Sequence, residues 1–151
     1  MDPLIFSLPH HPFDYQYLAS RLERYRSPRS KIGLMLRNGE IIRVKKGLYV
    51  VPEKYGKKLN KMLLSNLIYG PSYVSLEYAL AWWGLIPDRV ETVTAVTNKR
   101  IKHFETPVGV FSYKYINGAV YPIGRLIVDN DGQPFMIASR EKALCDKIAT
   151  V

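Results

Sequence analysis

The sequence predicts an α+β fold with two structural units. Apolar residues recur at helical spacing early in each unit and then alternate, as they do in strands. Charge divides the chain in the same way: residues 1–61 hold 13 basic and 5 acidic residues, a net of +8, whereas residues 62–151 hold 9 and 8. A proline, a glycine and mixed charges mark the boundary at 52–56. We therefore expect one unit at 1–55 and a second at 56–151.

Composition limits the classes of protein that this chain can represent. With 151 residues and 47% hydrophobic content it can bury a core, and its net charge of +9 indicates a polyanionic partner. The single cysteine, Cys145, excludes an internal disulfide and favours a reducing cytoplasm. The first residues lack a basic region followed by an apolar run, so we expect no signal peptide. Apolar patches such as 79–86 are too short to span a bilayer.

The chain begins with an arm and a helix. Residues 1–12 carry three prolines and no period, so we expect them either to pack against the first unit or to fray. The adjacent His10 and His11 have no carboxylate or cysteine cluster near them, and we predict no metal site there. A helix is expected from its cap, Asp14, to about Tyr25.

A second helix is predicted directly afterwards. Ser27 can cap it, Pro28 suits its first position, and Gly39 ends it. Gly33 costs about 1 kcal/mol of helix propensity relative to alanine, which is tolerable where the backbone must approach a ligand closely. The apolar face consists of Ile32, Met35 and Leu36. The opposite face is expected to carry Arg29, Ser30, Lys31, Gly33 and Arg37.

A basic hairpin follows, with strands expected at 40–45 and 48–51 and a turn at Lys46 and Gly47. Arg43 and Lys45 alternate with two apolar residues, so one face packs while the other presents cations. A helix followed at once by a basic hairpin is typical of the end of a winged helix-turn-helix. Arginine, lysine and serine are suitable for base edges and phosphates. The predicted DNA-contacting residues are Arg29, Ser30, Lys31, Arg37, Arg43, Lys45 and Lys46.

One question about this motif stays open at the level of the sequence. A full winged helix-turn-helix has three helices before its wing, and residues 13–38 leave room for two. Either the arm supplies a short extra turn, or the motif is a reduced version that has kept the shape without the binding.

The second unit is predicted as two helices on a small, mostly antiparallel sheet. We expect one helix at 57–69, whose apolar face consists of Leu59, Met62, Leu63, Asn66 and Leu67. A second helix is expected at 72–83, where Ser75 can act as the N-cap. Strands are expected from Val93, at 108–116, at 125–128 and at 134–138, the last after an Asn-Asp-Gly turn at 130–132. The basic residues Lys99, Arg100 and Lys102 are expected in a loop, as a further contact or as a solvated turn.

A last helix is predicted at 140–148, capped by Ser139. We expect Leu144 and Ile148 to face inwards, Cys145 to be a buried, inert thiol and Asp146 to be surface charge. Because so short a helix is marginal alone, we expect the protein to continue beyond residue 151.

Three segments in order carry a resemblance to a known family: the hairpin at 41–50, the stretch 73–80 with Trp-Gly-Leu-Ile-Pro at 83–87, and Arg-Glu-Lys-Ala-Leu-Cys-Asp at 140–146. Together they resemble the AbiEi antitoxins of type IV toxin-antitoxin, or abortive-infection, pairs. The resemblance implies a winged helix-turn-helix that binds operator DNA and represses its own operon. Repressors of this class bind inverted repeats as dimers or as cooperative monomers, so a dimer on DNA and cooperative monomers both stay open. It also implies a second domain that counters a nucleotidyltransferase-like toxin.

Other functions remain open alternatives. The sequence contains no Gly-rich phosphate loop, no Gly-x-Ser-x-Gly elbow and no His-Glu-x-x-His pattern, so we predict no enzyme, no catalytic residue and no cofactor. A protein-interaction module that docks a partner through its aromatic sheet face is one rival. An orphan transcriptional regulator whose winged helix is structural is another.

Overall fold

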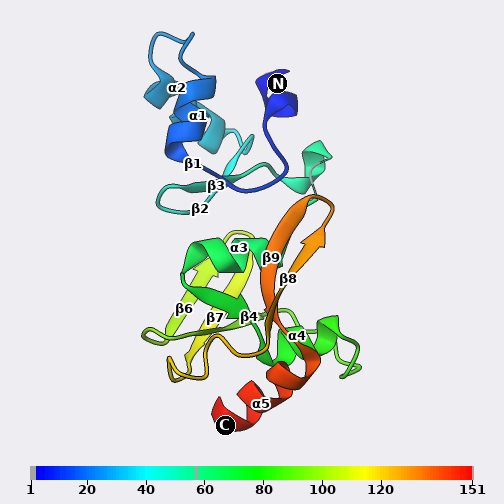
Figure 1. Ribbon diagram of the computed structural model, residues 1–151. Coiled ribbons are helices and arrows are strands. Elements are labelled where there is room, and N and C mark those ends of the chain that lie inside the picture. The colour runs from blue at the N-terminus through cyan, green and yellow to red at the C-terminus, as the bar shows by residue number, and fades with distance from the viewer. Residues whose placement is uncertain (1–2, 57, 151) are drawn as a thin grey trace. The chain divides into compact units, whose positions relative to one another are not determined.

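The computed structural model describes residues 3–56 and 58–150, and the chain forms two compact units, Met1–Asn60 (unit 1) and Lys61–Val151 (unit 2) (Figure 1). Both units mix helices and strands, so the α+β prediction is confirmed. The predicted boundary after residue 55 falls slightly before the observed division.

Unit 1 places two short helices beside a small sheet. Its three strands are ordered β1-β3-β2, and both pairs are antiparallel. In chain order the elements are the 3-10 helix η1 (Pro3–Ser7), β1 (Phe13–Asp14), α1 (Tyr15–Arg21), α2 (Pro28–Arg37), β2 (Ile42–Lys45), β3 (Leu48–Val50) and the 3-10 helix η2 (Glu53–Tyr55).

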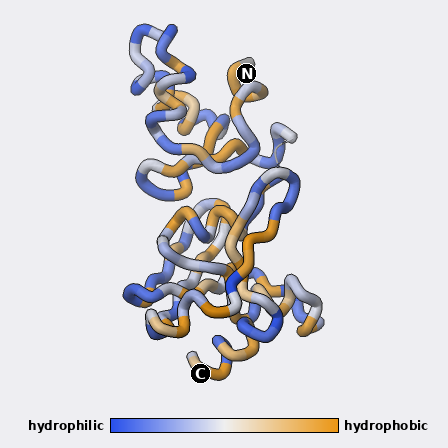
Figure 2. Tube along the Cα trace, viewed as in Figure 1, coloured by the Kyte–Doolittle hydropathy of each residue, from blue (hydrophilic) through white to orange (hydrophobic). Residues whose placement is uncertain are grey.

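The N-terminal arm packs against this unit. Leu4, Ile5 and Leu8 are buried in the core cluster that also contains Leu18 from α1 and Met35 from α2. The arm therefore packs rather than frays, and it contains one short 3-10 turn, η1. Figure 2 shows hydrophilic residues at the β2–β3 turn and in the connection that precedes α2.

Local signals set the helix ends in unit 1. The Asp14 carboxylate accepts the Tyr17 N–H at 2.8 Å and so begins α1, as expected. The helix ends at Arg21, however, and not near Tyr25, because the chain turns at Leu22, which is fully buried in the core cluster. The predicted Ser27 cap, Pro28 start and basic hairpin are all present.

Unit 2 is built on a six-stranded sheet of order β6-β7-β5-β4-β9-β8, in which three neighbouring pairs are antiparallel and β4–β9 and β5–β7 are parallel. In Figure 1, α3 lies above this sheet and α4 and α5 lie below it. The elements are α3 (Lys61–Ile68), β4 (Ser72–Val74), α4 (Leu76–Trp82), β5 (Val93–Thr97), β6 (Lys102–Thr106), β7 (Gly109–Tyr115), β8 (Arg125–Asn130), β9 (Gln133–Ala138) and α5 (Arg140–Thr150).

The helix predicted at 72–83 was wrong in its first part. Residues 72–74 form β4, a central strand in which every residue is buried, and such a strand shows no apolar alternation that would reveal it. Ser75 stands at the N-cap position of α4 without a capping side-chain bond. Strand β6, which was not predicted, begins at Lys102, so Lys102 lies in a strand and not in a loop.

The expected face of α3 was correct at Met62, which is buried, and wrong at Leu67. The helix begins at Lys61, later than predicted, and Lys57 lies outside the described residues. Leu67 is 47% exposed. The helix is rotated about its axis relative to the prediction. The Asn66 amide explains this rotation, because it accepts from the Met136 N–H at 2.7 Å and donates to the Met136 carbonyl at 3.3 Å. The buried residues of α3 are Met62, Leu64, Ser65 and Ile68.

The last helix, α5, is turned the other way from the prediction. Its cap is as expected, because the Ser139 hydroxyl accepts the Lys142 N–H at 3.1 Å. Leu144 and Ile148, expected inside, are 49% and 77% exposed, and Cys145 is exposed as well. Asp146, expected on the surface, is fully buried. The buried residues of α5 are Lys142, Ala143 and Asp146. Within 3–56 and 58–150, no helix has the length and apolar character that crossing a bilayer requires.

Candidate nucleic-acid interface

One side of α2 faces solvent along its whole length. Residues four apart lie on the same face of a helix, which aligns Arg29, Gly33 and Arg37 and places Ser30 and Leu34 beside them. Both arginines and Ser30 are exposed, and Leu34 is 41% exposed. We call these five residues the α2 outer face.

The start of α2 is arranged to receive an anion. The Ser27 hydroxyl accepts the Ser30 N–H at 3.4 Å and donates to the Ser30 hydroxyl oxygen at 2.9 Å. With its oxygen accepting this bond, the Ser30 hydroxyl can still donate its own proton to a phosphate oxygen. The first turn holds no acidic residue, so nothing there opposes the positive end of the helix dipole.

Gly33 lies in the middle of the α2 outer face with open space around it. A Cβ added there would meet no atom within 4 Å, so packing does not require a glycine at this position. The protein thus carries the helix-propensity cost of glycine, about 1 kcal/mol relative to alanine, without an internal reason. A bare backbone at this point lets a ligand approach α2 more closely than a side chain would.

Lys31 stands apart from the α2 outer face. It is half-buried, and its Nζ lies 5.1 Å from the ring centroid of Tyr25, while the Arg24 guanidinium lies 5.5 Å from the same centroid. The cation–π contact holds the Lys31 ammonium on the flank of α2. Of the predicted contacts on this helix, the structure brings together Arg29, Ser30 and Arg37 but not Lys31.

The β2–β3 hairpin carries the remaining predicted contacts. Val44 is buried, whereas Arg43 and Lys45 are exposed on either side of it, and the register shifts between them. Lys46 is exposed at the turn, where Gly47 adopts a φ of +83° that favours glycine. Three cations are therefore presented by one tight hairpin.

The acidic residue of this stretch is withdrawn from the surface. Residues 27–51 contain six cations and one carboxylate, that of Glu40. Glu40 is 8% exposed, its N–H donates to the Met35 carbonyl at 2.9 Å, and its Oε1 accepts from the Asn38 amide at 3.5 Å. The exposed charge of α2 and the hairpin is thus entirely positive, which favours a polyanionic ligand.

The sequence also singled out two histidines of the arm and the basic residues of unit 2. Among the described residues, no three His, Cys, Asp or Glu side chains are grouped to hold a metal ion, and this includes His10 and His11. Lys99 and Arg100 are exposed in unit 2.

Two features of the candidate interface were not predicted, namely the exposed Leu34 and the burial of Glu40. Leu34 follows Ser30 by one helical turn, a spacing that would have placed it on the α2 outer face. No residue near Glu40 in the sequence indicated that its carboxylate would be buried. No family model matches the chain, and no curated protein matches it significantly.

Proposed function

We propose that this protein binds double-stranded DNA through α2 and the β2–β3 hairpin, as a winged helix-turn-helix repressor. The observation that supports this most directly is the distribution of charge on residues 27–51. Their exposed charges are all positive, and their one carboxylate is buried. DNA affinity depends chiefly on such cations, because each phosphate that they neutralise releases counterions.

The geometry suggests how each element would contact DNA. The α2 outer face enters the major groove, where Arg29 or Arg37 can donate two parallel hydrogen bonds to guanine and Leu34 can contact a thymine methyl group. Ser30 and the start of α2 bind a phosphate. The hairpin, with Lys46 at its tip, lies along the backbone or in the minor groove.

We further propose that the protein is an antitoxin that represses its own operon and counters a nucleotidyltransferase-like toxin. This part rests on the resemblance to AbiEi antitoxins, which extends over segments of both units. Co-expression with the nucleotidyltransferase-like protein encoded beside it tests the idea: restored growth supports it, and unrelieved toxicity contradicts it.

The salt dependence of binding to the upstream region of the operon tests the DNA proposal. If about six phosphates are neutralised, log K should fall with log salt concentration with a slope near −5. Arg43→Ala and Lys46→Ala, which remove exposed cations of the hairpin, should each reduce the steepness of this slope by about one. Arg89→Ala is the matched control, because Arg89 is exposed in unit 2 and paired with Glu91 at 3.3 Å. No binding at low salt, or equal effects of all three variants, would contradict the proposal.

A further inference from the structure

Strand β8 forms one edge of the sheet of unit 2 and leaves apolar side chains in solvent. Within the described residues it pairs with β9 and with no strand beyond it. Leu126 is 42% and Ile127 is 73% exposed. The other edge strand, β6, exposes the polar Lys102, His103 and Glu105 instead. An exposed, apolar edge is a template for another strand, whereas charges protect an edge from pairing.

The backbone groups available on this edge follow from the β8–β9 register. Arg125 stands opposite Ala138, and the Ser139 N–H donates to the Gly124 carbonyl at 2.8 Å. Hydrogen-bonded and non-hydrogen-bonded residue pairs alternate along two antiparallel strands. Because Gly124 bonds to Ser139, the even-numbered residues of β8 are the ones that hydrogen-bond to β9. Pro134, which has no N–H, stands opposite Asp129, as this alternation requires. The N–H and C=O groups of Arg125, Ile127 and Asp129 therefore point away from β9.

The charges of these three residues make the edge complementary to itself. In an antiparallel pair centred on Ile127, each Ile127 stands opposite the Ile127 of a second copy. Arg125 then stands opposite Asp129 of the second copy, and Asp129 opposite its Arg125. Every residue whose backbone points outward thus meets another such residue. Opposite charges directly across a pair of strands stabilise it.

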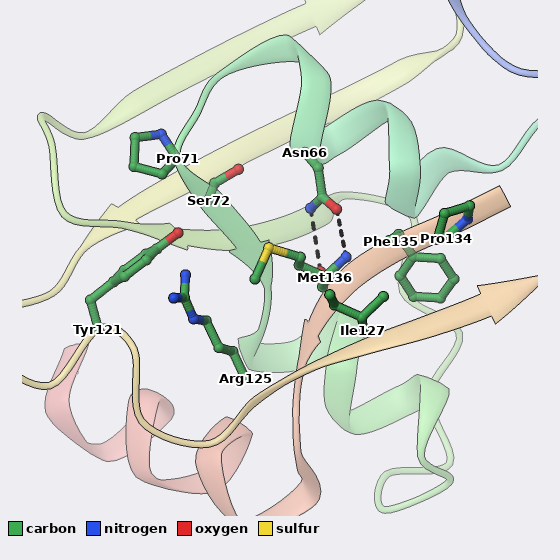
Figure 3. Close-up of a pocket in the computed structure, with 9 residues that line it drawn as sticks. All are labelled: Asn66, Pro71, Ser72, Tyr121, Arg125, Ile127, Pro134, Phe135 and Met136. Atoms are coloured by element: carbon green, nitrogen blue, oxygen red, sulfur yellow. Dashed lines mark hydrogen bonds between the residues drawn. The ribbon is translucent and has the colours of Figure 1, made fainter.

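Charge also selects this register among those that the backbone allows. A shift of the centre by one residue in either direction sets Arg125 or Asp129 against Ile127 of the other copy and removes both ion pairs. The side chains of Arg125 and Ile127 lie on the same side of β8, where they line an open hollow of about 320 Å³ with Tyr121, Phe135 and Met136 (Figure 3). Ile127 of a second copy can bury its exposed surface against this apolar wall.

We propose that β8 is a homodimerisation strand, which pairs antiparallel with β8 of a second copy about a two-fold axis at Ile127. Such an interface is isologous, so it closes at the dimer. The proposal rests on unit 2 alone and does not depend on DNA binding.

Charge exchange tests the register. We expect the protein to dimerise in the micromolar to millimolar range by sedimentation equilibrium. Arg125→Asp and Asp129→Arg should each weaken dimerisation by about tenfold or more, because each creates two like-charge pairs. The double variant Arg125→Asp/Asp129→Arg should restore it. An equimolar mixture of the two single variants should form heterodimers. The Arg125→Asp copy carries aspartates at 125 and 129, and the Asp129→Arg copy carries arginines at both positions, so each acid of one copy stands opposite an arginine of the other.

The control substitution is Glu105→Arg, which changes the charge on the opposite edge by the same amount. Circular dichroism melting checks that each variant folds, since the Asp129 carboxylate also accepts the Gly132 N–H at 2.8 Å. A monomeric wild type, a dimer indifferent to the single variants, or a dimer broken by Glu105→Arg would each overturn the proposal. Failure of the mixture to form heterodimers would overturn it as well.

Discussion

Lys142 and Asp146 form an ion pair of 3.1 Å on the buried side of α5, where 6% and 0% of their side chains are exposed. The second carboxylate oxygen of Asp146 accepts from the Ser75 hydroxyl at 2.6 Å and from the Tyr73 hydroxyl at 3.1 Å. The Lys142 ammonium also donates to the Val120 carbonyl at 3.0 Å. These contacts connect α5 to β4, to the start of α4 and to the loop before β8.

Removing one partner of this ion pair should be costly. Asp146→Ala leaves the Lys142 ammonium buried without its counter-charge and deprives Tyr73 and Ser75 of their acceptor. A buried pair broken in this way typically costs about 3–5 kcal/mol. We expect a loss of that size in the free energy of unfolding, measured by urea denaturation.

The matched control is the ion pair between Lys147 and Glu77, whose side chains are 47% and 37% exposed. Glu77→Ala also removes a carboxylate that α5 contacts, but solvent screens this pair. The expected loss is below about 1 kcal/mol. Equal losses from the two variants would show that the buried pair contributes no more than a surface one.

The same helix shows where the sequence stops predicting the fold. Leu144 and Ile148 recur at helical spacing, and they were predicted to face the core because the buried side of a helix is usually apolar. The buried side of α5 carries charges instead, and their partners, Tyr73 and Ser75, precede Asp146 by more than seventy residues. No residue close to α5 in the sequence indicates that these partners are present.

Several features set by neighbouring residues were predicted correctly. The Ser27 cap, the Pro28 start and the Asn-Asp-Gly turn each depend on a few adjacent residues, and Asp131 and Gly132 adopt φ values of +59° and +75° as such a turn needs. The candidate interface follows the same rule. Exposure of Arg29 followed from helical spacing, whereas the position of Lys31 depends on where Tyr25 lies in the folded unit.

Gly124→Ala should destabilise unit 2. Gly124 has a φ of +77°, and an added Cβ would lie 2.8 Å from the Cβ of Lys142, an atom held by the backbone of α5. The backbone strain of a positive φ in alanine and the overlap with the Lys142 side chain both destabilise the folded state. We therefore expect the unfolding free energy to fall by about 1–3 kcal/mol. Gly118→Ala is the control, because a Cβ there meets nothing within 4 Å. A loss from Gly118→Ala as large as that from Gly124→Ala would contradict this account.

Alkaline pH should destabilise unit 2 through Tyr113. Burial raises the pKa of Tyr113 from 10.0 to about 12, and the Tyr113 hydroxyl donates to the Ser65 carbonyl at 2.6 Å. Because the folded-state pKa is the higher one, this contribution to stability is complete below pH 10 and is lost as the pH rises to about 12. Two pK units correspond to about 3 kcal/mol.

The Tyr113→Phe variant isolates that contribution. We expect the unfolding free energy of the wild type to fall relative to that of the variant across this pH range. The variant should keep part of the alkaline loss, since burial and the neighbouring Asp146 also raise the pKa of Tyr73. Parallel pH profiles of wild type and variant would assign the alkaline loss to other groups.

Gly33→Ala should change stability and DNA binding in opposite directions. Alanine restores helix propensity, and its Cβ meets open space, so the unfolding free energy should rise by about 0.5–1 kcal/mol. The same methyl group stands where we propose that α2 approaches DNA, and it should lower affinity by about tenfold, which corresponds to about 1.4 kcal/mol. Arg29→Ala serves as the control, because it should weaken binding without raising stability. A Gly33→Ala variant that is more stable and binds DNA as tightly as the wild type would exclude close approach at this face.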